Sequence, residues 1–169
     1  PGRVTRTISA TVASTEATVL IDIGHELPDV TIVDGSVEID AALPLVTGFA
    51  HFSGGYSSRF GGMPVYFAAR FDRPPSSRGV WQGAALAEGE LSRAGGDVGA
   101  WFGFDTTTDP EVGVAIGISF ADVQHALANL TAEVPAFDFD GARTAAEASW
   151  EQALSRVRIT AQTARDLEI

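Results

Sequence analysis

One boundary constrains the fold of this chain more than any other feature: a long series of strand patterns ends, and helical patterns begin, after residue 120. Residues 111–120 alternate bulky apolar side chains with small or polar ones, which predicts a strand with one bulky and one nearly bare face. No helical pattern separates the earlier strands, whereas parallel strands need crossover helices between them. We therefore expect antiparallel sheets rather than an α/β fold.

Strand patterns separated by turn signals fill the sequence before that boundary. The strands are expected near residues 4–12, 17–23, 43–52, 65–71, 80–87 and 98–105. A hairpin is expected from residues 30–33 and 37–39, with its turn at Asp34–Gly35. Residues 53–62 contain four glycines, three serines and two aromatic residues, which indicates a shaped surface loop. Eight to ten strands followed by two helices predict an all-β fold, a large antiparallel β-sandwich with a helical exit.

Two helices are predicted after the last strand. Ser119 stands in the N-cap position of the first, and Pro135 ends it. Its apolar stripe consists of Val123, Ala126, Leu127, Leu130 and Val134. The second helix is expected to begin at Asp138 or Asp140 and to carry Trp150 and Leu154 on an apolar face that needs a partner, so this pair is the predicted domain interface.

A further strand pattern and a domain boundary complete the expected organisation. Residues 156–159 alternate again and predict a short final strand. We expect residues 1–120 to form the sandwich domain and residues 121–169 to form a helical connector plus that strand. The start of the chain lacks the apolar core of a signal peptide, and we expect both ends to be boundaries within a longer protein.

The composition excludes several classes of function. With 11 Lys and Arg against 22 Asp and Glu, the net charge is −11, so nucleic acid and anionic membrane surfaces are poor partners. The absence of cysteine excludes disulfides, thiolate catalysis and cysteine-based zinc sites. No apolar run approaches the roughly 20 residues of a membrane-spanning helix.

Histidines and paired carboxylates are the residues that could carry chemistry. His25, His51 and His125 have no second ligand at metal spacing on the same element, and Asp22 with His25 is interpreted as a polar pair at a strand end. The close carboxylate pairs, the residue type that glycoside hydrolysis uses, are Glu38/Asp40 and Asp138/Asp140. Both are interpreted as structural, so no catalytic residue and no metal ligand is predicted in this chain.

Aromatic residues provide the candidate ligand contacts, because aromatic rings stack against the apolar C–H faces of sugars. The candidates for carbohydrate contact are Phe52, Tyr56, Arg59, Phe60, Trp81 and Trp101. Aromatic residues at strand spacing are also common in a core, and that alternative stays open for each of them.

Several segments together resemble one enzyme family. They are Leu20–His25, Pro64–Phe71, Gly117–Phe120, residues 128–135, Phe137–Asp140 and the helix that contains Trp150. In this order and spacing they resemble the N-terminal domain of glycoside hydrolase family 92, a family of calcium-dependent exo-acting α-mannosidases. The resemblance covers most of the chain and implies a sandwich of the galactose-mutarotase-like kind.

The resemblance also implies a function for the protein to which this chain belongs. That protein is expected to be a secreted or periplasmic, inverting exo-α-mannosidase that hydrolyses α-mannosidic or mannose–phosphate linkages in glycans. The family's acid, base and calcium ligands lie in a later helical-barrel domain, so calcium is expected there and this chain alone is expected to be inactive. Its expected partners are that domain and a mannose-containing glycan.

Two other functions remain open at this point. A stand-alone carbohydrate-binding module fits a β-sandwich with exposed aromatic residues, although such a module has little use for a helical tail. A mutarotase-like epimerase would need two histidines in one cleft, which His25 and His51 could supply.

Overall fold

The computed structural model describes residues 5–11, 15–26 and 28–156 of the chain, with residues 5–11 described by their backbone. These residues form ten strands, one short 3₁₀ helix and two α-helices. The chain divides into two compact units, Pro1–Phe137 and Asp138–Ile169. The first unit contains both sheets and the first α-helix.

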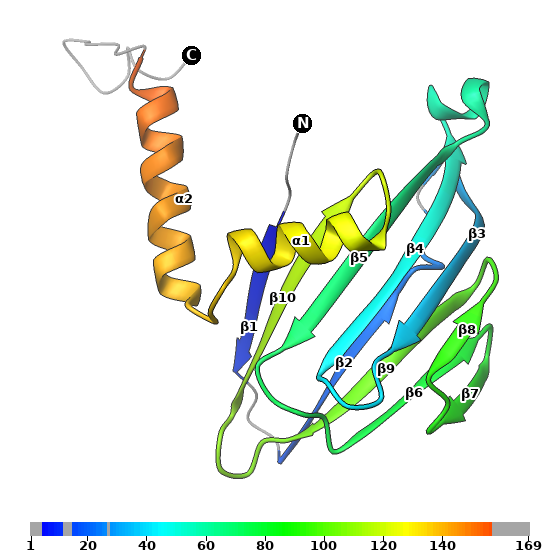
Figure 1. Ribbon diagram of the computed structural model, residues 1–169, viewed down its shortest axis with the longest axis horizontal. Coiled ribbons are helices and arrows are strands. Elements are labelled where there is room, and N and C mark those ends of the chain that lie inside the picture. The colour runs from blue at the N-terminus through cyan, green and yellow to red at the C-terminus, as the bar shows by residue number, and fades with distance from the viewer. Residues whose placement is uncertain (1–4, 12–14, 27, 157–169) are drawn as a thin grey trace, which may run out of the picture. The chain divides into compact units, whose positions relative to one another are not determined.

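Two antiparallel sheets form the first unit (Figure 1). Sheet A has the order β1-β10-β5-β4-β3-β8, and its strands are β1 (Thr5–Thr11), β3 (Val30–Ile39), β4 (Leu45–Gly54), β5 (Met63–Phe71), β8 (Ser92–Ala94) and β10 (Glu111–Ser119). Sheet B has the order β2-β9-β6-β7, and its strands are β2 (Glu16–Asp22), β6 (Ser77–Gln82), β7 (Ala85–Glu88) and β9 (Val98–Asp105). The all-β antiparallel sandwich followed by two helices is therefore confirmed.

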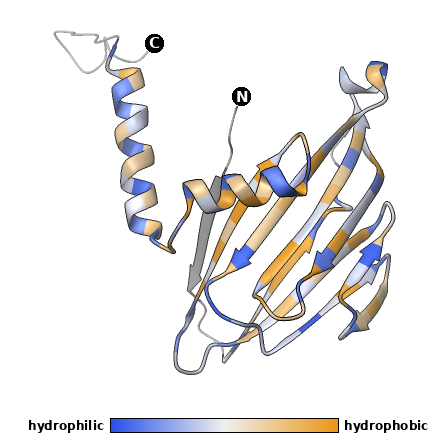
Figure 2. Ribbon diagram, in the orientation of Figure 1, coloured by the Kyte–Doolittle hydropathy of each residue, from blue (hydrophilic) through white to orange (hydrophobic). Residues whose placement is uncertain are grey.

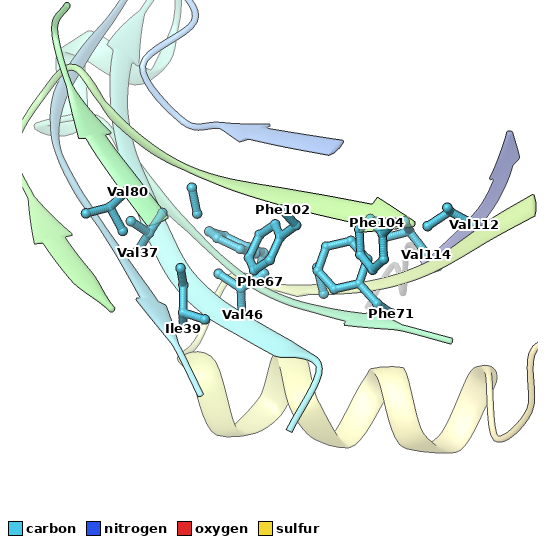
Figure 3. Close-up of a cluster of buried hydrophobic side chains, with 12 residues drawn as sticks. Val37, Ile39, Val46, Phe67, Phe71, Val80, Phe102, Phe104, Val112 and Val114 are labelled. Carbon is cyan, nitrogen blue, oxygen red and sulfur yellow. The ribbon is translucent and has the colours of Figure 1, made fainter. Parts of the chain in front are cut away.

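The main core lies between the two sheets, where alternate residues of each strand meet. Hydrophobic and hydrophilic residues alternate along several strands (Figure 2), as a sheet with one buried face requires. Phe71 of β5 contacts Phe102 and Phe104 of β9, with ring centroids 4.5 Å and 5.1 Å apart. Figure 3 shows these rings with valines from both sheets around them. Three mutually packed phenylalanines thus join the sheets.

The helix α1 (Val123–Glu133) covers part of the outer face of sheet A, across β10 and β5 (Figure 1). Ala126 and Leu130 of the helix are buried against Ala68 and Ala115 of the sheet. A side chain at Gly117 would lie 2.8 Å from Cβ of Leu130, so the bare face of β10 is where the helix packs. The predicted apolar stripe of α1 is thus confirmed, and the bareness of β10 has a physical reason.

The expected hairpin at Asp34–Gly35 is wrong, because β3 runs without interruption from Val30 to Ile39. Asp34 and Gly35 pair with His51 and Ala50 of β4, and a bulge between Ile32 and Asp34 accommodates the extra residue. Gly35 is needed for close approach and not for a turn, since a Cβ there would lie 2.9 Å from the carbonyl oxygen of Phe49. The turn lies at residues 40–44, after β3.

Three smaller expectations also need correction. The single strand expected at residues 80–87 is two strands, β6 and β7, which a two-residue turn at Gly83–Ala84 joins. The polar link after it contains β8. Ser119 does not cap α1: it ends β10, and Asp122 caps the helix by accepting a hydrogen bond of 2.7 Å from the backbone N–H of His125. A carboxylate three residues before that donor reaches it, whereas Ser119 is still in the strand.

The second unit contains the helix α2 (Phe139–Leu154). Asp138 caps it by accepting a hydrogen bond from the N–H of Gly141, which agrees with one of the two caps expected. None of its residues is buried, and Trp150 and Leu154 are 68% and 65% exposed. The predicted strand at residues 156–159 falls outside the described residues except for Arg156. No helix in the described ranges has the length and apolar character needed to cross a membrane.

Candidate functional site

Three of the sequence candidates meet at the tip of the β4–β5 hairpin, which projects at the upper right of Figure 1. The 3₁₀ helix η1 (Ser57–Phe60) forms this tip. The rings of Tyr56 and Phe60 lie 6.0 Å apart, and the guanidinium of Arg59 lies 5.5 Å from the centroid of the Tyr56 ring. Both rings are 76% exposed. We call Tyr56, Arg59 and Phe60 the tip cluster.

Local hydrogen bonds fix the shape of the loop that carries the tip cluster. The hydroxyl of Ser57 donates to the carbonyl of Gly54 at 2.9 Å, and Nε2 of His51 lies 2.9 Å from the carbonyl oxygen of Gly61. Gly61 and Gly62 have φ angles of 82° and 89°, in the left-handed region that glycine adopts most easily. The shaped surface loop predicted from the glycines and serines is confirmed.

Trp81 and Trp101 lie on the outer face of sheet B and not at the tip. On β6 and β9 the core-facing residues are Val80, Ala100 and Phe102, so the alternate positions face outward. Trp81 is paired with Gly99, and Trp101 is paired with Gly79. The six carbohydrate candidates therefore do not form one site.

A glycine lies under each of these two indoles. A Cβ at Gly99 would lie 2.1 Å from the ring of Trp81, and a Cβ at Gly79 would lie 2.8 Å from Nε1 of Trp101. Each ring therefore lies down across the neighbouring strand. Around them is an open hollow of about 550 Å³, lined also by Thr18, Leu20, Leu86 and the Gly83–Ala84 turn. We call this surface the sheet B platform.

Phe52 belongs to neither group. It is half-buried on β4 and is paired with Met63 of β5, close to the base of the tip. No ring contact joins it to Tyr56 or Phe60 within the described residues. Its position fits a packing role as well as a ligand contact.

The carboxylates that the sequence singled out have structural partners. Backbone N–H groups of Leu43 and Ala42 donate to Asp40, and these hydrogen bonds hold the pKa of its carboxyl below the usual range. Asp138 caps α2, and Asp140 forms an ion pair of 3.1 Å with Arg143. These bonds support the structural interpretation of both pairs.

The histidines are likewise separate. Nδ1 of His125 lies 2.8 Å from the Asp122 carboxylate at the start of α1, and His51 is bound to the tip loop. Asp22 accepts a hydrogen bond from the N–H of Gly24, next to the exposed His25. Among the described residues, no three His, Cys, Asp or Glu side chains form a group that could hold a metal ion.

Sequence reasoning missed the residues that shape the sheet B platform. Leu20 and Leu86 were not singled out, although they are 62% and 74% exposed beside the tryptophans. The signal that could have found them is the sequence Gly79-Val80-Trp81 and its counterpart Gly99-Ala100-Trp101, in which glycine and tryptophan share one face of a strand.

Two family models match the chain in succession. The Glycosyl hydrolase family 92 N-terminal domain matches residues 9–119, and the Glycosyl hydrolase family 92 catalytic domain matches residues 125–169. Comparison with curated proteins finds no significant match.

Solved structures with the same fold are described as mannosidases. The family GH92 inverting mannosidase BT2199 of Bacteroides thetaiotaomicron VPI-5482 is 20% identical, with a TM-score of 0.81 over 94% of this chain. The family GH92 alpha-mannosidase BT3965 of Bacteroides thetaiotaomicron is 23% identical, with a TM-score of 0.80 over 94% of this chain. The GH92 family glycosyl hydrolase ccman5 is 23% identical, with a TM-score of 0.80 over 97% of this chain. This chain spans only 20%, 22% and 21% of those three proteins.

Proposed function

Because the chain belongs to glycoside hydrolase family 92, we propose that it is the non-catalytic N-terminal sandwich and connector of an inverting exo-α-mannosidase. The enzyme hydrolyses α-mannosidic linkages in glycans, and a mannose–phosphate linkage is the alternative substrate that the family allows. Its place of action is outside the cell or in the periplasm. Calcium belongs to the later catalytic domain, together with the acid and the base.

The observation that carries this proposal is the order of the two family matches. The N-terminal model ends at Ser119, where β10 ends, and the catalytic model begins at His125, within α1. The chain therefore runs from one domain type into the other in the order of a family enzyme. Since it spans about a fifth of the solved relatives, the catalytic machinery is proposed to lie in residues beyond this sequence.

The local chemistry is consistent with a supporting role. The close carboxylate pairs serve a turn and a helix start, where hydrogen bonds and an ion pair engage Asp40, Asp138 and Asp140. A general acid or base needs a reachable proton in a substrate cleft. The sequence candidates for that role are used instead to hold the backbone.

The tip cluster is the proposed point of contact with the substrate. Tyr56 and Phe60 present exposed rings at the end of a hairpin, and Arg59 adds hydrogen-bond donors for sugar hydroxyls. We include Phe52 at the base of this hairpin as a lesser candidate. A loop held by Ser57 and His51 can project such contacts toward a neighbouring domain without being reordered.

The exposed face of α2 is the proposed contact with the catalytic domain. Trp150 and Leu154 expose large apolar surfaces, which a domain partner would remove from water. If this holds, Trp150→Ala destabilises the complete enzyme by about 3–5 kcal/mol and the 169-residue chain by much less. Equal losses in the two proteins would refute the contact.

The proposal is tested by assaying the complete open reading frame beside this chain. The complete enzyme is expected to hydrolyse an aryl α-mannoside, to lose activity with a calcium chelator, and to release β-mannose first, as proton NMR detects. The chain alone is expected to release none. Turnover by the chain alone, or a complete enzyme inactive on both mannosides and mannose phosphodiesters, would refute the proposal.

A further inference from the structure

We propose that the sheet B platform binds glycan chains, with adjacent pyranose rings stacked on Trp81 and Trp101. The choice of an α-mannose oligosaccharide as the ligand rests on the proposed function. The platform itself rests on the geometry of the outer face of sheet B, whereas α1 covers the outer face of sheet A.

The two indoles are arranged in a staggered pattern. One cross-strand row contains Asp22, Gly99, Trp81 and Leu86, and the next contains Leu20, Trp101, Gly79 and Glu88. In both rows a tryptophan lies beside a glycine, so each ring has room to lie over the neighbouring strand. Diagonal positions on adjacent strands are about 7–8 Å apart, which suits two rings that each hold one sugar unit.

The surroundings of the rings suit a sugar. Leu20 and Leu86 extend the apolar area, and both are well exposed to solvent. Asp22 and Glu88 stand at opposite ends of the two rows, on β2 and β7. A carboxylate accepts hydrogen bonds, and sugar hydroxyls donate them. The platform therefore offers an apolar centre for the C–H face of a pyranose and acceptors at its margin for the hydroxyls.

The size and charge of the platform favour a glycan over a macromolecular partner. Seven residues line the hollow, whereas a standard protein interface uses about 20–30 residues on each side. The net charge of −11 disfavours nucleic acid and anionic lipid. A neutral, flat and hydroxylated ligand a few units long matches both features.

The test uses the 169-residue chain and α-linked mannotetraose as the probe. The three tryptophans give three indole N–H signals in NMR spectra, which single substitutions assign. On titration we expect shifts at Trp81 and Trp101, while Trp150 on α2 serves as the internal reference. Calorimetry with Leu86→Arg, which blocks the hollow from an exposed position, is expected to show binding weakened about tenfold.

Matched variants serve as controls for the platform. Leu43→Arg makes the same change at another exposed leucine, in the turn after β3, and is expected to leave binding intact. Trp81→Ala is expected to abolish binding, with circular dichroism to confirm that it folds; Leu86→Arg keeps the test valid if it does not. Absence of indole shifts at millimolar ligand, or equal binding by Leu86→Arg and Leu43→Arg, overturns the proposal.

Two further outcomes are distinguishable. Self-association that Leu86→Arg abolishes, without any oligosaccharide binding, overturns the proposal in favour of an interface between copies of the chain. Binding of a gluco-oligosaccharide but not mannotetraose upholds the platform and overturns the assignment of mannose. The readout needs no hydrolysis, so an inactive parent enzyme would count only against the proposed function.

Discussion

The outer faces of the two sheets use small residues for different purposes. On sheet A, Ala68, Ala115 and Gly117 make room for α1, which buries Ala126 and Leu130. On sheet B, Gly79 and Gly99 make room for two indoles, and the surface above them stays open. Glycine weakens a strand by itself. In both sheets its presence marks a place where another group lies flat on the backbone.

This difference also separates stability from recognition. A helix of the same unit stabilises the fold by covering sheet A, whereas exposed rings on sheet B contribute little burial and remain available to a ligand. We therefore expect matched substitutions on the two faces to have unlike effects.

The largest effect is expected from shortening a leucine on each face. Leu130 is 2% exposed under α1, so Leu130→Ala is expected to lower the free energy of unfolding by about 2–5 kcal/mol. Leu86 is 74% exposed on sheet B, so Leu86→Ala is expected to change it by less than about 0.5 kcal/mol. Urea unfolding of both variants measures the contrast, and similar losses would contradict it.

A methyl group added to the glycines should sharpen the contrast. In Gly117→Ala the new Cβ would meet the backbone oxygen of Ala126 at 2.5 Å, so we expect a loss of about 1–3 kcal/mol. In Gly99→Ala it would meet the Trp81 ring, which can move, so we expect a smaller loss and a change in tryptophan emission. Gly96→Ala, where the nearest atom is 3.4 Å away, is the control. A larger loss in Gly99→Ala than in Gly117→Ala would count against the comparison.

Arg70 connects the outer face of sheet A to the end of α1. Its Nη2 donates to the carbonyl of Val134 at 2.7 Å, and its guanidinium lies 5.2 Å from the centroid of the Phe137 ring. Arg70→Ala is expected to lower the free energy of unfolding by about 1–3 kcal/mol, since it removes a charged hydrogen bond and a ring contact. Urea unfolding checks this. An unchanged midpoint would show that α1 is held by its apolar stripe alone.

The smallest effect is expected from acid. The backbone N–H and then the imidazole of His125 lower the pKa of Asp122, and hydrogen bonds likewise lower the pKa of Asp40 and Asp105. A lowered carboxyl pKa stabilises the fold above the unfolded value of about 3.9, and this stability is lost as the pH falls through the folded pKa. Asp122→Asn keeps a helix cap without a titrating group. Urea midpoints from about pH 5 to about pH 2 should fall less steeply in this variant.

The sequence predicted the elements better than their connections. Alternation located β2, β4, β5, β9 and β10, and the apolar stripe located α1, because these patterns depend on burial along one element. The Asp34–Gly35 turn failed because a short turn signal does not reveal that Gly35 is buried against β4. A long-range contact decided that conformation.

The candidate sites were predicted as residue types and not as groups. Tyr56, Arg59 and Phe60 are close in the sequence, so their cluster could be expected. Trp81 and Trp101 meet only because β6 pairs with β9 in one register, and no local pattern contains that information. The same holds for Leu20, which β2 brings to the platform from a distant part of the chain.

The pairing of β1 with β10 also has a consequence for biosynthesis. Thr5 pairs with Gly117 and Thr11 with Glu111, so the first and last strands of the sandwich are neighbours, and β10 lies between β1 and β5. Contacts so distant in the sequence carry a high loop-closure cost and slow folding. On the ribosome, hairpins such as β4–β5 can form early, but sheet A cannot close until β10 has left the exit tunnel. We therefore expect β1 to remain without its strand partner through most of translation, which makes it the segment that chaperones have most time to engage.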